Sequence, residues 1–272
     1  MRRVDFAPLT PEGGGLTGYL HDPDNSYIHR GPRPAILVIP GGGYRKLVEH
    51  EGDPVAWEFF ASGFHTFLLT YSLWDPACPQ PLGWTPLAQA SQALRLIREH
   101  AGEWNVSPGR VAVMGFSAGG HLAGSCAVLW DRPELKARLG AADRRNRPDA
   151  AVLAYPATRM TGPYAHQNSR RCLAGEGDPS PFDLTSQARA DTPPCFVWST
   201  MADEHVPVEN SLEFVQALRR CGVPCELHLF AEGRHGLGLG TAEAVESHPH
   251  LASWVPLCKR WLGRQFDFPV SV

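Results

Sequence analysis

The segment Gly115-Phe116-Ser117-Ala118-Gly119 constrains the fold most strongly, because it places a serine between two glycines at the end of a strand pattern. A Val-rich apolar run that starts at Arg110 leads into it, and small, helix-compatible residues follow. This order predicts a strand, a sharp turn with Ser117 at its tip, and a helix. The glycines suit such a turn because they have no Cβ to crowd the serine. An ordinary glycine-rich connection is the alternative, and only partner residues elsewhere in the chain distinguish the two.

Continuous apolar runs alternate with helix patterns along the chain. Besides the strand before Ser117, we expect strands at 34–39, 65–71, 150–155, 195–200 and 225–230, and one or two short strands up to Asp24. Apolar spacing predicts helices at 55–62, 87–104, 120–130, 208–218 and 254–261. This alternation is typical of an α/β fold with a mostly parallel central sheet and helices on both faces.

We therefore predict a single α/β domain spanning residues 1–272. Residues 157–194 interrupt the alternation with a polar stretch that is too long for a plain connection. Such stretches in compact domains are usually lids or unstructured segments. We expect residues 157–194 to form a short insertion that acts as a partial cap, with a solvated surface excursion as the alternative.

Composition narrows the class of protein. The chain has 272 residues, of which 43% are hydrophobic and 19% charged, as in soluble globular proteins. A net charge of -3 indicates no nucleic-acid or anionic-membrane partner. No apolar run is long enough to span a bilayer, and no apolar leader follows the N-terminal Met1-Arg2-Arg3. We expect a cytoplasmic protein that acts on a small molecule, and leave homo-oligomer formation open.

The seven cysteines are scattered without the spacing of metal ligands. Cys126, Cys195 and Cys258 lie inside apolar segments, which favours buried free thiols in a reducing compartment. We expect no metal and no cofactor.

Three further segments that follow strands carry candidate chemistry. Ligands of parallel sheets lie beyond the carboxyl ends of the strands, where these segments should meet Ser117. The first is Gly41-Gly42-Gly43, whose backbone N–H groups can approach an oxyanion closely. A flexible turn is the alternative for these glycines.

The second segment, which begins at Met201, contains Asp203 and Glu204. A carboxylate there can orient an imidazole, and we select Asp203 because it is shorter and nearer the strand end. A solvated acidic loop or a helix N-cap is the alternative. The third segment places His235 between two glycines after the strand 225–230. We assign surface or structural roles to the histidines at 121, 228, 248 and 250.

The chain order is then Ser117, Asp203, His235, which is the order of serine, acid and histidine in hydrolases built on this type of sheet. The chain resembles the α/β-hydrolase superfamily over most of its length. Residues 115–120 resemble the nucleophile elbow of esterases related to hormone-sensitive lipase. Residues 202–211 resemble their acid loop, and residues 233–236 their histidine loop. The closest resemblance is to small cytoplasmic members described as acetyl-xylan-esterase-like or feruloyl-esterase-like.

This resemblance implies that Ser117 is the nucleophile, His235 the general base and Asp203 the residue that orients it. Backbone N–H groups of Gly42, Gly43 and Ala118 would form the oxyanion hole. Pro40 occupies the position of the histidine in the His-Gly-Gly-Gly motif of related esterases, so the anchoring of this loop must differ. Which of the three glycines donates stays open.

The predicted activity is that of a serine carboxylesterase acting on a small-molecule ester through an acyl-enzyme. An amide-cleaving relative, such as a formamidase or peptidase, would use the same residues, and a non-catalytic binding protein is a further alternative. The polar character of 157–194 favours acetyl-type esters of carbohydrates over long acyl chains. Trp74 and Trp84 are candidates for an aromatic platform under a sugar ring, with simple packing as the alternative.

Overall fold

The computed structural model describes residues 1–22, 31–140, 143–242 and 245–271, so Asp24 lies outside the described residues. Eight strands of the described chain form one sheet in the order β1-β2-β4-β3-β5-β6-β7-β8. All pairs from β4 to β8 are parallel, whereas β1 and β2 are antiparallel to their neighbours. The strands are β1 (Arg2–Phe6), β2 (Gly15–Leu20), β3 (Arg33–Ile39), β4 (His65–Thr70), β5 (Val106–Phe116), β6 (Ala150–Ala154), β7 (Cys195–Thr200) and β8 (Cys225–Phe230).

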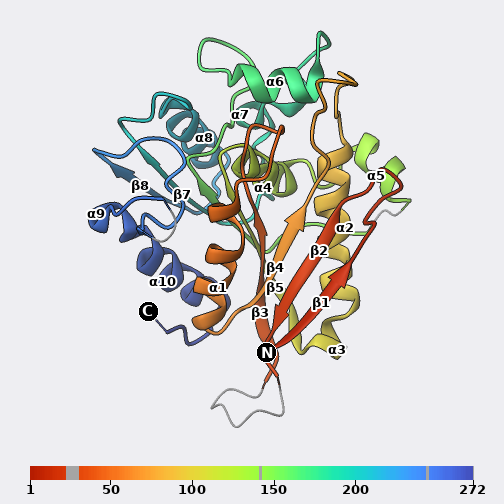
Figure 1. Cartoon of the computed structure of the whole chain (residues 1–272), viewed down its shortest axis with the longest axis vertical. Helices are drawn as coiled ribbons and strands as arrows, with labels where there is room; N and C mark the ends of the chain where they lie inside the picture. Colours follow the sequence, from red (N-terminus) through yellow and green to blue (C-terminus); the bar gives the residue numbers. More distant parts are fainter. Residues whose placement is uncertain (23–30, 141–142, 243–244, 272) are drawn as a thin grey trace.

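Helices cover both faces of this sheet (Figure 1). One face packs against α1 and α10, and the opposite face against α2, α4 and α8. The long helices are α1 (Asp53–Ala61), α2 (Thr85–Glu99), α4 (Ala118–Val128), α6 (Gln167–Ala174), α8 (Glu209–Arg220) and α10 (Trp254–Phe266). The shorter ones are η1 (Glu49–Glu51), α3 (Ala101–Trp104), α5 (Pro133–Leu139), η2 (Ser180–Phe182), α7 (Leu184–Gln187) and α9 (Pro249–Ala252).

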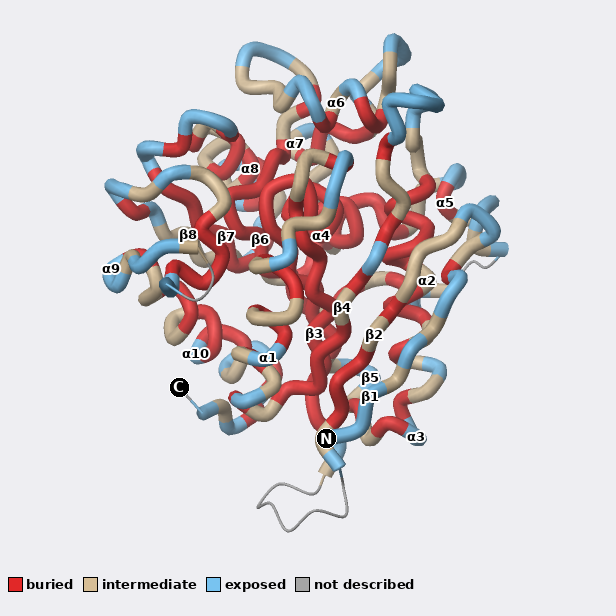
Figure 2. The backbone as a smooth tube through the Cα atoms, viewed as in Figure 1, coloured by how far each residue is buried: buried red, intermediate tan, exposed pale blue. Residues whose placement is uncertain are grey.

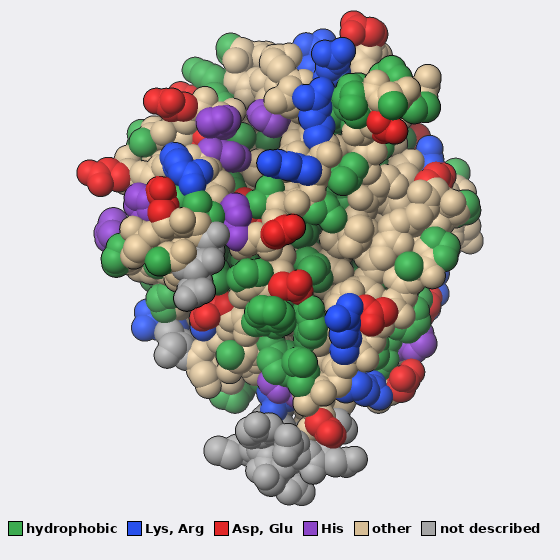
Figure 3. All heavy atoms as spheres, in the orientation of Figure 1, with side chains coloured by type: hydrophobic (Ala, Val, Ile, Leu, Met, Phe, Trp, Pro, Cys, Tyr) green, Lys and Arg blue, Asp and Glu red, His purple; other side chains and the backbone are tan. Residues whose placement is uncertain are grey.

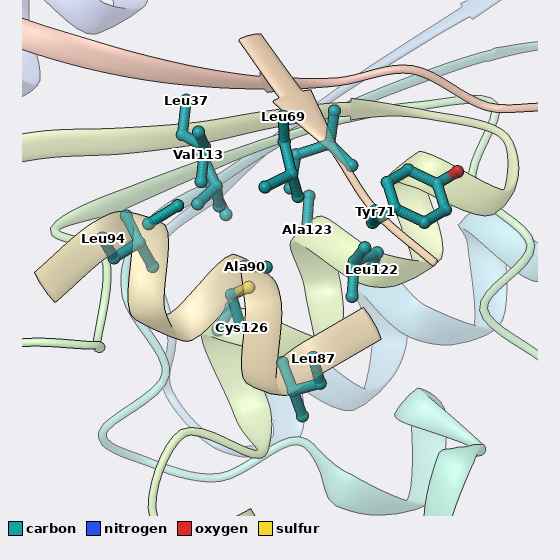
Figure 4. Close-up of a cluster of buried hydrophobic side chains, with 14 of the residues drawn as sticks. Leu37, Leu69, Tyr71, Leu87, Ala90, Leu94, Val113, Leu122, Ala123 and Cys126 are labelled. Atoms are coloured by element: carbon teal, nitrogen blue, oxygen red, sulfur yellow. The ribbon is translucent and has the colours of Figure 1, made fainter. Parts of the chain in front are cut away.

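The central strands are apolar because helices bury both of their faces. Every residue of β3 and β6 is buried, and Figure 2 shows this buried centre as one continuous region. Figure 4 shows how α2 and α4 pack on one face: Leu87, Ala90 and Leu94 meet Cys126 and the strand residues Leu37 and Val113. Burial of apolar side chains at about 25 cal/mol per Å² is what holds these layers together. The α/β fold predicted from the alternating patterns is confirmed.

One detail differs from the sequence prediction. The helix expected at 87–104 ends at Glu99, and α3 adds one separate turn after His100. The His100 ring stacks on Trp104 at 4.6 Å, so packing rather than a continuous helix holds this last turn. Residues 157–194, which the sequence predicts as a cap-like insertion, contain α6, η2 and α7. Figure 1 shows α6 at the end of the molecule toward which the parallel strands point.

All seven cysteines are free thiols, and Cys126, Cys195 and Cys258 are buried as predicted. No helix in the described part of the chain is long and apolar enough to cross a membrane.

Candidate active site

Ser117 occupies the sharp turn between β5 and α4 that the sequence predicts. Its φ of 53° and ψ of -117° are unusual for a residue with a side chain. The neighbouring glycines permit this turn. A Cβ on Gly115 would lie 2.0 Å from the Gly119 carbonyl oxygen, and a Cβ on Gly119 would lie 2.2 Å from the Ile39 oxygen. The backbone therefore folds tightly enough to present Ser117 at the end of the sheet.

The structure brings Ser117, His235 and Asp203 together in one hydrogen-bonded row. The Ser117 Oγ lies 2.8 Å from His235 Nε2, and His235 Nδ1 lies 2.6 Å from Asp203 Oδ2. The carboxylate accepts from Nδ1–H, which leaves Nε2 free to accept the proton of the serine hydroxyl. The three residues follow the ends of β5, β7 and β8. Along the chain, Ser117 is 118 residues and Asp203 is 32 residues from His235.

Asp203, rather than Glu204, occupies the acidic position of this row. The Asp203 side chain is fully buried, whereas Glu204 is exposed. Its second oxygen, Oδ1, accepts from the backbone N–H groups of His205 and Val206, each at 2.9 Å. Burial by itself raises the pKa of Asp203, but the hydrogen bond and charge of His235 and these two N–H donors outweigh it. The pKa of Asp203 is therefore below its ordinary value, and the carboxylate stays ionised.

The other histidines have structural partners. His121 accepts the Tyr44 hydroxyl at Nδ1 and donates from Nε2 to the Phe182 carbonyl oxygen, at 2.7 and 2.8 Å. His228 and His248 each pair with a glutamate two residues earlier, and the ring of His250 packs on Phe230. None of the four joins the row of Ser117, His235 and Asp203.

The glycine loop after β3 lies beside Ser117. A Cβ on Gly41 would lie 3.0 Å from Ser117 Cβ, so the loop backbone is close to the serine. The N–H of Gly41 donates to Glu51 Oε2 at 2.8 Å and is therefore engaged. Within the described residues, the N–H groups of Gly42 and Gly43 donate to no other protein group. These two groups and the N–H of Ala118, at the start of α4, are the available donors near Ser117.

Glu51 and Tyr155 complete the site, and the sequence analysis missed both. Glu51 is 1% exposed, and its Oε1 accepts the Tyr155 hydroxyl at 2.7 Å. The hydroxyl in turn accepts the N–H of Gly238 at 3.0 Å, three residues after His235. The Tyr155 ring also packs edge-on against the His235 ring, with centroids 5.0 Å apart. Glu51 lies in the acidic stretch Glu49–Asp53, which reads from sequence as a solvated helix start.

The insertion 157–194 is anchored from beneath by Asp183, which is 2% exposed. Its Oδ2 accepts from Arg159 Nε, from the backbone N–H groups of Met160 and Thr161, and from the Thr161 hydroxyl. The large apolar residues Leu173 and Phe182 point into the main core rather than toward the rim. The upper surface of the insertion is correspondingly polar, as the sequence indicates.

Histidine and basic side chains gather at the rim. His166 caps the N-terminus of α6, because its Nδ1 accepts the N–H of Ser169. The Oγ of Ser169 also lies 2.8 Å from this Nδ1. Burial lowers its pKa to about 4, with a smaller contribution from the charge of His235. Figure 3 shows histidines between α6 and α8, and a column of Lys and Arg side chains that runs down from α6 on the same face.

The two tryptophans considered as a sugar platform take packing roles. Trp74 is 7% exposed, and the guanidinium of Arg45 lies over its ring at 4.8 Å. Trp84 packs on Phe182 with ring centroids 5.2 Å apart. The idea of an open aromatic platform is therefore wrong for Trp74, because a cation already covers the ring.

A family comparison fits this geometry. The BD-FAE family model matches residues 25–218. The chain belongs to the BD-FAE family. It is 40% identical over 237 residues to endo-1,4-beta-xylanase B of Butyrivibrio fibrisolvens, covering 84% of this chain and 35% of that protein. It is 31% identical over 216 residues to the acetylxylan esterase of Xylanibacter ruminicola, covering 76% of this chain and 42% of that protein.

A solved relative covers nearly the whole chain. The acetyl ester-xyloside bifunctional hydrolase of Caldicellulosiruptor lactoaceticus superimposes with a TM-score of 0.79 at 36% identity, covering 97% of this chain and 92% of that one. The family and these relatives show an α/β-hydrolase fold of the esterase type. The chain spans less than half the length of the two curated relatives described above. The described ranges contain no group of three or more His, Cys, Asp or Glu residues that could hold a metal ion.

Proposed function

We propose that this BD-FAE member is a serine carboxylesterase that removes acetyl-type acyl groups from carbohydrate esters. The observation that carries this proposal is the row from Ser117 Oγ through His235 to buried Asp203, next to three free N–H donors. The names of the relatives, among them an acetylxylan esterase, support the same class of substrate.

Each step uses groups of this chain. Ser117 Oγ attacks the ester carbonyl carbon while His235 Nε2 takes the hydroxyl proton, and Asp203 stabilises the imidazolium that forms. The carbonyl oxygen becomes an oxyanion that accepts hydrogen bonds from the N–H groups of Gly42, Gly43 and Ala118. His235 then gives its proton to the leaving alcohol as the C–O bond breaks, which produces an acyl-enzyme. Water, deprotonated by His235, then attacks the acyl carbon. The bond from that carbon to Ser117 Oγ breaks, His235 returns the proton to Oγ, and the acid is released.

The insertion supports a short acyl group. Its large apolar residues Leu173 and Phe182 are buried in the core, which leaves little apolar surface for a fatty chain. A polar rim suits a hydroxyl-rich leaving group instead.

The test is hydrolysis of 4-nitrophenyl acetate by the wild type and by Ser117→Ala, with 4-nitroacetanilide as the matched amide. We expect turnover of the ester alone, and a loss in kcat of about 10⁵-fold or more in the variant. Ser125→Ala is the control, because Ser125 is also buried on α4 but its hydroxyl donates only to the His121 carbonyl oxygen. Unchanged ester hydrolysis in Ser117→Ala, or turnover of the anilide at a similar rate, would overturn the proposal.

A further inference from the structure

Two arginine side chains lie against one indole ring at the rim of the site. The guanidinium carbon of Arg45 is 4.8 Å from the centre of the Trp74 ring, and that of Arg171 is 5.9 Å from it. Arg45 follows Gly43 by two positions, in the glycine loop after β3 that we call the oxyanion loop from here on. Arg171 lies on α6. Both arginines are exposed, so their guanidinium groups are accessible to a ligand.

Backbone hydrogen bonds hold this arrangement in place. The Trp74 N–H donates to the Tyr44 carbonyl oxygen at 2.8 Å, which joins the loop after β4 to the oxyanion loop. The Leu82 N–H donates to the Cys172 carbonyl oxygen at 2.9 Å, which joins the same loop to α6. Trp74 therefore lies between two segments that are fixed relative to one another.

The pair has no acidic partner, unlike a similar pair elsewhere in the protein. Arg144 and Arg189 lie over the ring of Trp130, at 4.9 and 5.3 Å. There, Asp191 pairs with both arginines and Asp131 with Arg189, so carboxylates neutralise the cations.

No ion pair to Arg45, to Arg171 or to the adjacent Lys46 exists in the described residues. The carboxylate nearest to Trp74 in sequence, Asp75, accepts the Ala77 N–H instead. Two uncompensated guanidinium groups on one ring repel each other, and a bound carboxylate would relieve that repulsion.

We propose that Arg45 and Arg171 form a subsite for a carboxylate on the sugar part of the ester substrate, as in an acylated uronic acid. This inference rests on the proposed esterase function and specifies its substrate class. A guanidinium group that lies over an aromatic ring presents N–H donors at its edge, and these can bind a carboxylate.

The test compares methyl tri-O-acetyl-glucuronoside with the corresponding glucuronamide, which has nearly the same size but no charge. We expect kcat/KM for the acid to exceed that for the amide by about tenfold at low salt, as for an accessible charge-assisted contact. The ratio should fall toward one in Arg45→Gln/Arg171→Gln and on addition of salt. Arg219→Gln is the control, because Arg219 is also exposed and unpaired within the described residues but lies at the end of α8.

A wild-type ratio near one, or a ratio that the double variant keeps, would overturn the subsite. If neither acetylated sugar is hydrolysed, inhibition of 4-nitrophenyl acetate turnover by the unacetylated acid and amide decides the same question. Equal inhibition by the two would count against the subsite. If the wild type does not hydrolyse 4-nitrophenyl acetate, the proposed esterase function itself is refuted.

A second inference comes from a different observation, the buried carboxylate of Glu51. One oxygen holds the Gly41 N–H of the oxyanion loop, and the other holds the Tyr155 hydroxyl, which binds the Gly238 N–H of the histidine loop. A third contact joins the same segments, since His50 Nε2 donates to the Gly236 carbonyl oxygen at 2.8 Å. The hydrogen-bonded chain from Gly41 to Gly238 therefore links the donors for the oxyanion to the loop that carries His235.

The structure assigns Glu51 and Tyr155 as positioning residues that hold these two loops in register, given the proposed esterase reaction. Neither residue needs to touch the substrate, because each acts through the backbone of a loop. This pair also supplies the anchoring that Pro40, in place of a histidine, leaves open.

Tyr155→Phe tests this assignment, since it removes the hydroxyl without emptying the core. We expect kcat for 4-nitrophenyl acetate to fall by about tenfold with little change in KM, because the transition state depends on loop geometry more than ground-state binding does. Tyr19→Phe is the matched control: its buried ring also donates a hydroxyl to a carboxylate, but that carboxylate is Asp53, at the start of α1, rather than a residue of either loop.

Both variants should lower the melting temperature, and only Tyr155→Phe should lower kcat. Glu51→Gln, which keeps one oxygen for the Gly41 N–H, should retain more activity than Glu51→Ala. A folded Tyr155→Phe with wild-type kcat, or equal activity of the two Glu51 variants, would show that the pair serves stability alone.

Discussion

Asp183→Asn probes how firmly the insertion 157–194 is anchored to the rest of the domain. One oxygen of the buried carboxylate accepts two backbone N–H groups and the Thr161 hydroxyl, and it also pairs with Arg159 at 3.1 Å. Asparagine keeps a carbonyl oxygen for some of these donors but loses the charge opposite Arg159. Breaking a buried pair from one side costs about 3–5 kcal/mol. Arg159 also contacts Glu213, which reduces the loss, so we expect about 2–4 kcal/mol.

Urea unfolding measures this loss as a lower midpoint at an unchanged slope. Asp178→Asn is the control, since Asp178 lies in the same insertion but is exposed and accepts only from Ser180. The control should leave the midpoint where it is. An Asp183→Asn midpoint that also stays unchanged would refute the view that this carboxylate anchors the insertion.

The stability lost in Asp183→Asn should also depend on pH. Burial raises the pKa of Asp183, but the Thr161 hydroxyl, Arg159 and the two N–H donors outweigh it, so its pKa lies below the ordinary value. A carboxyl with a lowered pKa in the folded state contributes stability above its unfolded pKa, and this is lost as the pH falls. The stability difference between wild type and Asp183→Asn should therefore shrink below about pH 4. A difference that stays constant down to pH 2 would contradict this account.

Further predictions concern catalysis. Asp203→Asn should lower kcat by about 10⁴-fold, because the imidazole then adopts the wrong tautomer, whereas Glu204→Gln should have little effect; steady-state kinetics of both variants decide which carboxylate is used. Across 4-nitrophenyl esters from acetate to laurate, kcat/KM should be highest for acetate, and a maximum at octanoate would contradict the short-acyl pocket. Gly119→Ala should abolish soluble expression or activity, since its Cβ would lie 2.2 Å from the Ile39 oxygen, and an active variant would show that the turn tolerates more than its geometry indicates.

The sequence was informative where a local pattern and a chemical need coincide. The apolar runs of β3, β6 and β7 are continuous because both faces of these strands are buried, so they stand out without a structure. Ser117, Asp203 and His235 could be selected because each follows a strand, and parallel strands bring their carboxyl ends to one edge. The break between α2 and α3 was not predictable, because it depends on the packing of Trp104 against His100.

The sequence does not reveal that Asp183 and Glu51 are buried. Glu51 lies in an acidic stretch of the chain and Asp183 lies within the polar stretch 157–194, so each reads as a solvent-exposed acid. In the structure, both are almost fully buried: Glu51 accepts the Gly41 N–H and the Tyr155 hydroxyl, and Asp183 accepts the N–H groups of Met160 and Thr161. For Trp74 the sequence misleads in the other direction: an aromatic residue in a loop suggests an exposed platform, but Arg45 covers its ring.

Pro40, in place of the histidine of related esterases, shows how the buried Glu51 bears on function. Pro40 cannot donate a hydrogen bond from its side chain, so the glycine loop needs another anchor. The structure supplies two: Tyr71 donates its hydroxyl to the Pro40 carbonyl oxygen at 2.7 Å, and Glu51 accepts the Gly41 N–H. Because Glu51 occupies the Gly41 donor, the oxyanion of the proposed reaction is left to Gly42, Gly43 and Ala118. The question of which glycine donates thus turns on a carboxylate ten residues further along the chain.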